Sequence, residues 1–447
     1  MDTLRARLET FWGEREATRL EQHARGDARF DLREVYRRFE DLSAGERLDE
    51  TAGWLEQETL ASRQDGPRRL LALSRSIVLD ASSAERAFAA AEAGIDPERR
   101  RDLLDQAFVH WGEACARLGF GTAGDYFVSR FPAARLGVWR SSAEAVLERT
   151  AGSYRDALHE HAARADLNVA TLSFSELQSL SRWSALDARF ESAGAVAALG
   201  FFAAGLGIVP DRLSALAFRD AEGPGIACFA PRVPEAIVVS MGSVAGAARY
   251  RAGLAAGGIG ISTAFTSPEL PVERRIAPDP GLRQGWGFLF ADNLAEEAWL
   301  QEFVGQRAAD FAREVACWEL IALRHAAASL VFELDLAALP CGSEPGAAIE
   351  AFVDGIRESL GVSIDPRLAI PVHALELPSL HWLRGRAFAS QLRDFLRHEF
   401  GRSFWRERRC GDLLKELWQT GTTYSAEQLT DELGFGPLVL DPQFDPG

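Results

Sequence analysis

The stretch that most constrains how this chain can fold is GLAAGGIG, residues 253–260, which lies in a segment of helical length that ends in the turn TSPELP. Four of its eight residues are glycine, and only Leu254 and Ile259 carry a side chain larger than a methyl group. Each glycine costs a helix about 1 kcal/mol relative to alanine. A helix here therefore implies that its bare surface either packs closely against a neighbouring helix or lines an open channel.

Composition places the chain among globular proteins and excludes several classes of partner. Its 447 residues are 47% hydrophobic and 26% charged, which suits two to three ordinary domains or one large helical body. The net charge of −16 argues against a nucleic-acid partner, because phosphate-binding surfaces are basic. The five cysteines form no CxxC pair and no apolar leader opens the sequence, so we expect a reduced, cytoplasmic protein.

The pattern of apolar and polar residues changes along the chain. Residues 1–165 read as a succession of amphipathic helices and are predicted to form an N-terminal helical region. Residues 166–447 form the second region, and after Pro210 it contains short apolar segments bounded by Gly or Pro that predict strands at 212–220, 225–234 and 235–242. Long helical patterns then resume, so the chain is predicted to be mostly α with a small β element.

Two local sequence signals that lie before the β element add to this prediction. Ser173 followed by Glu176 matches a helix capping box. The run 193–210 has no charged residue and approaches the length of a membrane span, but glycines divide it and GLGIVPD reads as a helix end. We interpret this run as a buried helix and expect no membrane association.

From Gly223 onward the order of several motifs is distinctive: CFAPRVPEAIVV, ARYRAGLAAGGIG, TAFTSPELP, QGWGFLFADNL, LIALRHAAASLVFELDL and LHWLRGRAFASQLRDFLRHEFG. In these motifs the chain resembles bacterial members of the thimet oligopeptidase and oligoendopeptidase F family of zinc metallopeptidases, with looser similarity back to about Leu172. The resemblance implies a mostly α, zincin-like clamshell with a deep central channel and a small β element before the active-site helix.

The resemblance also indicates which positions would carry the chemistry. Relatives place a histidine, a general-base glutamate and a second histidine in HExxH, and these positions correspond to Ala255, Ala256 and Ile259. The third zinc ligand, a glutamate in relatives, corresponds to Gln284. A catalytic zinc needs three protein donors and an open position for water. We therefore predict a vestigial site that has no zinc, no other cofactor and no catalytic residue.

The sequence leaves open what else the channel contains. His373, Glu376 and His381 are near enough in sequence to form a replacement metal site. Arginine and aromatic side chains near the former site suit a peptide backbone or carboxylate, although they also suit turn charges and core packing. The candidate peptide-contacting residues are Arg274, Arg275, Trp286, His381, Trp382 and Arg384.

These observations predict a catalytically degenerate pseudoenzyme of the oligopeptidase type. We expect it to bind a peptide or to serve as a scaffold or regulatory partner of another protein, including an active homologous peptidase. The alternative is an active hydrolase that uses relocated metal ligands or new chemistry.

Overall fold

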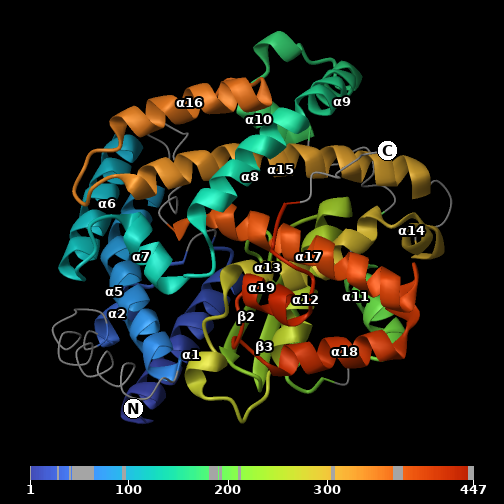
Figure 1. Ribbon diagram of the computed structural model, residues 1–447, viewed down its shortest axis with the longest axis horizontal. Helices are drawn as coiled ribbons and strands as arrows, with labels where there is room; N and C mark the ends of the chain where they lie inside the picture. Colours follow the sequence, from blue (N-terminus) through green and yellow to red (C-terminus); the bar gives the residue numbers. More distant parts are fainter. Residues whose placement is uncertain are drawn as a thin grey trace.

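The computed structural model describes residues 2–27, 30–39, 42, 65–92, 97–180, 190, 194–209, 213–303, 308–365 and 376–440. Within these ranges the chain is mostly helical and surrounds one three-stranded sheet, as the sequence predicts (Figure 1).

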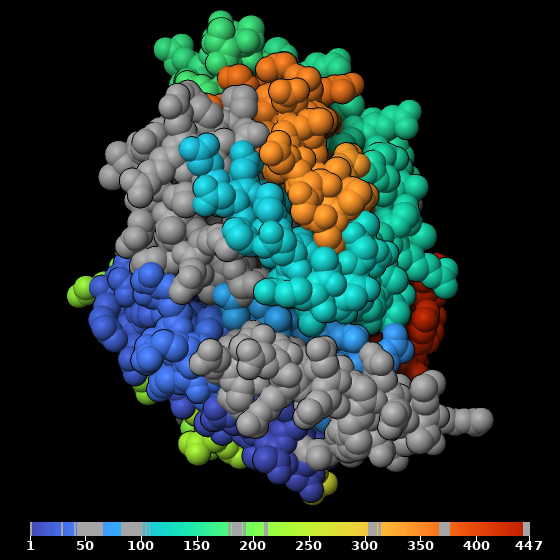
Figure 2. All heavy atoms as spheres, turned by 90° about the vertical axis from the view of Figure 1, so that its left-hand side faces the viewer, coloured from blue at the N-terminus to red at the C-terminus, as the bar shows by residue number. Residues whose placement is uncertain are grey.

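Helices are the regular elements of the N-terminal region where it is described. Its helices are α1 (Asp2–Ala24), α2 (Arg33–Arg38), α5 (Asp65–Glu92), α6 (Pro97–Arg117), α7 (Ala123–Arg130), α8 (Leu136–Arg149) and α9 (Ala151–Arg164), followed by the 3-10 turn η1 (Val169–Thr171). Helix α7 begins at a capping box, in which Thr122 and Asp125 exchange side-chain and backbone hydrogen bonds. Figure 2 shows one face of the molecule. On this face, parts of α1 and α2 lie below the teal helices of this region and also below α16 (Gly346–Leu360).

The predicted capping box and the predicted helix in the charge-free run are both present. Helix α10 (Phe174–Leu180) starts at the predicted capping box: Ser173 N donates to Glu176 Oε2 over 2.8 Å, and Glu176 N donates to Ser173 Oγ over 3.3 Å. The charge-free run forms the short helix α11 (Gly194–Gly205), one side of which is buried. The helix stops where Gly207 adopts a φ of 73°, which a glycine reaches without strain.

The three predicted strands form one sheet in the order β1-β3-β2. Strand β3 (Ala236–Met241) pairs in parallel with β1 (Leu216–Asp220) and antiparallel with β2 (Ile226–Arg232). Helix α1 is anchored to this sheet, because His23 Nδ1 lies 2.8 Å from the Ser240 hydroxyl. The sheet thereby joins the first helix of the chain to the helices that follow residue 245.

The remaining elements lie after the sheet. They are α12 (Gly246–Ala264), η4 (Val272–Arg274), α13 (Pro280–Ala291), η5 (Asp292–Ala295), α14 (Glu297–Phe303), α15 (Ala308–Ala338), α16, α17 (Pro378–Phe400), η7 (Phe404–Arg406), α18 (Arg408–Gln419) and α19 (Ala426–Glu432). Figure 1 shows α15 running between α16 and α17. The segment Glu314–Ala338 of α15 is long and apolar enough to cross a membrane, but its most apolar window is 72% buried, as in the core helix of a globular protein.

Hydrophobic packing crosses the predicted boundary between residues 1–165 and 166–447. The largest core cluster contains Trp111 and Trp139 from the first region together with Trp286 and Phe388 from the second. A smaller cluster joins α1, α2 and α5 to Val272. The two regions therefore share a core, and the division between them remains a prediction from the residue pattern of the sequence.

Candidate functional site

The glycines of α12 are sites of close contact between helices. A methyl group at Gly258 would lie 2.6 Å from Phe290 Cδ2 and 2.9 Å from the Trp286 carbonyl oxygen, both on α13. A methyl group at Gly257 would overlap the side chain of Leu199 on α11. Carbon atoms in contact normally sit about 3.5–4.0 Å apart. The sequence left two roles open for this bare surface, close packing against a neighbouring helix or the lining of an open channel. Gly257 and Gly258 have the packing role.

Helices α12 and α13 lie side by side, as the resemblance predicts. A methyl group at Gly287 of α13 would lie 3.1 Å from the Ala255 carbonyl oxygen and 3.3 Å from Ile259 Cδ1. Ala255 and Ile259 therefore face Gly287 across this interface, where the Ile259 side chain covers the bare backbone. Gln284 lies on the same helix, but its Cβ atom is directed at α17, 2.9 Å from the place of a methyl group at Gly385.

The residues at this interface do not fit a zinc ion. Ala255, Ala256 and Ile259 have no side-chain nitrogen, oxygen or sulfur atom, so they cannot ligate a metal. Gln284 offers one neutral amide oxygen, and its Oε1 atom is buried without a hydrogen-bond partner. Among the described residues, no group of three or more His, Cys, Asp or Glu side chains is placed to hold a metal ion.

A cavity of about 400 Å³ lies between the N-terminal helices and the second region. Residues of α1, α5 and α7 form one side of it, and residues of α12, α13 and α17 form the other. Gln284 lines this cavity, whereas Ala255, Ala256 and Ile259 do not. Its aromatic lining residues are Phe11, Trp12, Trp111, Tyr126, Phe127, Phe131, Trp286 and Trp418. The volume falls at the lower end of the range for small-molecule and cofactor pockets.

Three of the six candidate peptide-contacting residues line this cavity: Arg275, Trp286 and His381. The guanidinium of Arg275 already binds the carbonyl oxygens of Leu270 and Val233 and the carboxylate of Glu9. Its role is to connect α1 to the loop after β2, and few of its donors remain for a ligand.

The other three candidates, Arg274, Trp382 and Arg384, do not line the cavity. Trp382 packs its ring edge-on against Phe288, with the centroids 5.5 Å apart, and lies partly buried against the core. Arg274 is half-buried, and its carbonyl oxygen accepts a hydrogen bond from the backbone of Thr422.

The structure places Arg384 in buried ion pairs and not in the lining of this cavity. Its side chain is 0% exposed. Arg384 Nη2 lies 2.8 Å from Asp279 Oδ2 and 2.5 Å from Glu427 Oε2, while its Nε donates to Glu427 Oε1 over 2.7 Å. Asp279 is also the N-cap of α13, where it accepts from Leu282 N. Arg384 therefore secures the start of α13 against α17 and α19.

The structure describes only two of the three residues of the hypothetical replacement metal site, because His373 lies outside the described residues. Glu376 and His381 both line the cavity. Arg384 Nη1 lies 3.3 Å from His381 Nδ1, and an arginine can only donate, so the imidazole proton resides on Nε2. Burial, followed by the charges of Arg384 and Arg130, holds the pKa of His381 well below its usual range. Such a cationic environment opposes the binding of a metal cation.

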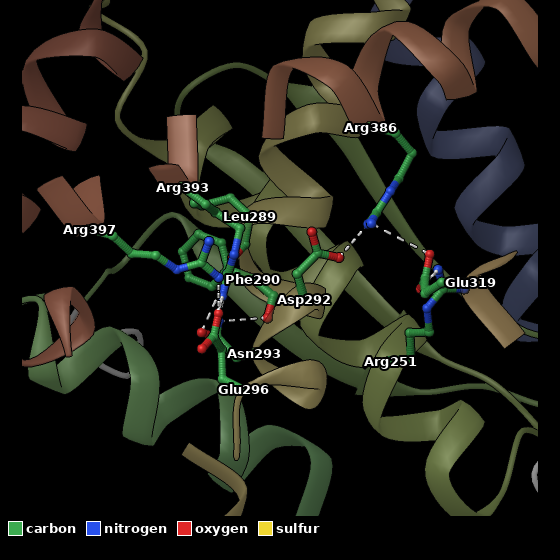
Figure 3. Close-up of polar contacts among 10 residues, drawn as sticks. All are labelled: Arg251, Leu289, Phe290, Asp292, Asn293, Glu296, Glu319, Arg386, Arg393 and Arg397. Carbon is green, nitrogen blue, oxygen red and sulfur yellow. Dashed lines mark hydrogen bonds and ion pairs between the residues drawn. The ribbon is translucent and has the colours of Figure 1, made fainter. Parts of the chain in front are cut away.

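A buried ionic network lies one helical turn before Ala255. Figure 3 shows Arg251 of α12 beside Glu319 of α15, with Nη2 2.6 Å from Oε1. Arg386 of α17 reaches both Asp292, at 2.5 Å, and Glu319, at 3.6 Å. All four side chains are at most 20% exposed. Two arginines and two carboxylates balance in charge, and together they join α12, α15 and α17 to the end of α13.

A second network lies on the other side of η5 (Figure 3). Glu296 accepts from Arg393 over 2.6 Å and also pairs with Arg397. Arg393 Nη1 donates to the carbonyl oxygen of Leu289 over 2.9 Å. Although burial alone raises the pKa of Glu296, the charges of the two arginines outweigh it and the net pKa is lowered. Neither network can be read from the sequence, because the partners lie far apart in the chain.

Comparison with known proteins places the fold. No protein-family model and no curated protein matches the sequence. The structure is similar to an M32 carboxypeptidase from Deinococcus radiodurans R1, with 12% identity, a TM-score of 0.63, and coverage of 99% of this chain and 97% of that one. A carboxypeptidase from Pyrococcus furiosus has 11% identity and a TM-score of 0.66, with coverage of 99% and 96%.

A putative oligoendopeptidase F is also similar, with 12% identity, a TM-score of 0.55, and coverage of 90% of this chain and 80% of that one. The chain thus has the mostly helical fold of zinc metallopeptidases. More particularly, it matches M32 carboxypeptidases over nearly the full length of both chains, and an oligoendopeptidase over a smaller share. At these identities the similarity concerns the fold alone.

Proposed function

We propose that this protein is a non-catalytic relative of the metallopeptidases that binds peptides, and that it acts in the cytoplasm as a scaffold or regulatory partner. The observation that carries the proposal is the interface between α12 and α13. There, Ala255, Ala256 and Ile259 stand at the positions that the family resemblance assigns to two zinc ligands and the general base.

Losing these side chains removes two separate requirements of zinc-dependent hydrolysis. Without at least three donors the metal is not held, and Gln284 supplies only a neutral amide oxygen. Without a carboxylate at residue 256, no side chain at that position accepts the proton of an attacking water. Restoring either function alone therefore leaves the other missing.

Peptide binding is supported by what the fold retains. The cavity beside Gln284 has an aromatic lining, and the buried Gln284 Oε1 atom has no hydrogen-bond partner within the chain. A backbone N–H of a bound peptide is a suitable donor for that oxygen. The cationic surroundings of His381 make a hydrolase with relocated ligands the weaker alternative.

Metal analysis combined with a peptidase assay tests the proposal. We expect the purified full chain to contain no stoichiometric zinc and to leave a mixed library of peptides uncleaved. One tightly bound zinc per chain, together with cleavage that a chelator stops, would refute the proposal.

A stepwise restoration sharpens this test. Ile259→His alone should gain no metal, because it adds one imidazole beside a neutral amide. The quadruple variant Ala255→His, Ala256→Glu, Ile259→His and Gln284→Glu should bind zinc, because α12 and α13 already lie in contact. We expect its affinity to be about 10–100-fold weaker than that of a supported site, since the partners that orient the ligands are missing.

A further inference from the structure

The lining of the cavity is positively charged, in a chain whose net charge is −16. Among the described residues, five arginines but only three carboxylates line it, and one of these arginines, Arg275, is already paired with Glu9 outside the lining. A local excess of one charge in an enclosed, low-dielectric space attracts ligands of the opposite charge. The sequence gives no sign of this excess, because the arginines come from helices on both sides of the cavity.

The excess is concentrated around one carboxylate, Glu16 of α1. Arg19 Nη1 lies 2.8 Å from Glu16 Oε1, and Arg15 Nη1 lies 3.4 Å from the same atom. Although burial raises the pKa of Glu16, the charges of Arg19, Arg15 and Arg283 outweigh it and the net pKa is lowered. Arg15 and Arg19 therefore share one carboxylate, although Arg15 also interacts with Tyr36 and Asp80, and Arg283 donates to the carbonyl oxygen of Cys228.

The neighbouring carboxylates do not remove this excess. Asp80 interacts electrostatically with both Arg15 and Arg130, and Glu376 interacts with Arg130 as well, so neither carboxylate is available to Arg19. The buried Nε of Arg15 has no hydrogen-bond partner. Burial lowers the pKa of Arg19, and Arg15 and Arg283 lower it further, as expected where positive charges crowd together. A carboxylate brought into this space would relieve that repulsion.

We propose that the cavity binds an acidic peptide segment, whose side-chain carboxylate is held by Arg15 and Arg19. This inference rests on the proposed peptide-binding function and specifies its ligand. Two unpartnered atoms in the lining have opposite requirements: Arg15 Nε needs an acceptor, and Gln284 Oε1 needs a donor. An acidic peptide supplies both, through its carboxylate and its backbone N–H, whereas inorganic phosphate supplies chiefly acceptors. The aromatic lining suits the remaining peptide surface.

Isothermal titration of the full chain with two matched peptides tests this inference. The probes are an alanine pentapeptide with a central glutamate, blocked at both ends, and its glutamine counterpart. Blocking the ends leaves the side chain as the sole anionic group. We expect the glutamate peptide to bind about tenfold more tightly, because it alone forms charge-assisted hydrogen bonds.

Two variants in the lining should shift that preference in opposite directions. Arg19→Gln should reduce the preference for the glutamate peptide, and Glu16→Gln should increase it by removing the competing carboxylate. Glu16→Gln keeps the size of the side chain, so the inference remains testable if Arg19→Gln does not fold. Arg357→Gln, which changes an exposed arginine of α16, is the matched control and should leave both affinities unchanged.

The possible failures have different meanings. Equal binding of the two peptides would overturn the acidic preference and leave peptide binding intact. Failure of both peptides to bind would overturn peptide binding as well. If inorganic phosphate binds as tightly as the glutamate peptide, the cavity is a simple anion site and the inference is wrong.

Discussion

The glycine pair of α12 gives the most direct test of how this protein differs from an open-channel peptidase. Replacing Gly258 by alanine adds one methyl group, which on helix propensity alone should stabilise α12 by about 1 kcal/mol. That methyl would lie 2.6 Å from Phe290 Cδ2 and 2.9 Å from the Trp286 carbonyl oxygen. The backbone oxygen belongs to α13 and cannot rotate away, so the two helices must separate.

The expected magnitude follows from these distances. Relieving contacts of this kind in a packed core costs about 1–3 kcal/mol. The oxygen is part of a helix backbone, so the cost should lie at the upper end and exceed the gain in propensity. We expect Gly258→Ala to lower the free energy of unfolding by about 1–2 kcal/mol.

Gly253→Ala is the matched control in the same helix. Its methyl would lie 3.4 Å from Ala195 Cβ and 3.6 Å from Met241 Cε, close to ordinary contact distances. We expect this variant to be neutral or more stable by up to about 1 kcal/mol. Urea unfolding of both variants, followed by far-ultraviolet circular dichroism and by tryptophan fluorescence, measures the difference. A Gly258→Ala protein at least as stable as Gly253→Ala would show that open space lies beside the glycine pair.

Three further predictions concern the buried charges and the metal. The carboxylate of Glu333 accepts hydrogen bonds from the backbone and hydroxyl of Ser379, and its burial raises its pKa from 4.5 to about 8. The folded state holds this proton more tightly than the unfolded state does. The contribution of Glu333 to the free energy of unfolding should therefore be complete below pH 4.5 and decline by about 1.4 kcal/mol per pH unit until about pH 8. Urea unfolding across this range should show a shallower decline of stability with pH for Glu333→Gln, and an identical decline would contradict the assignment. Arg384→Gln leaves Asp279 and Glu427 without their buried partner, so it should cost about 3–5 kcal/mol in urea unfolding, whereas the exposed Arg357→Gln should cost less than about 0.5 kcal/mol. Finally, a chelator such as EDTA should leave the thermal unfolding midpoint unchanged, and a marked decrease would indicate a structural metal.

Local features of this protein could be read from the sequence because their causes are local. The capping box at Ser173 and Glu176, the end of α11 near Gly207 and the three strands all depend on residues within a few positions of one another. The same holds for the bare surface of α12, since the absence of donor atoms at Ala255, Ala256 and Ile259 is a property of the residues themselves.

Tertiary structure decided what surrounds that surface. Arg384 was predicted to contact a peptide, and in the fold it forms buried ion pairs with Asp279 and Glu427, which lie 105 and 43 residues away in the chain. The arginines of α1 looked like ordinary charges between apolar positions, and they acquire a role only where α1 meets α13 across the cavity. Nor could sequence decide between a channel and a packed interface at Gly258, because the glycine is compatible with both. That choice depends on Phe290 and Trp286, which the fold brings within contact distance.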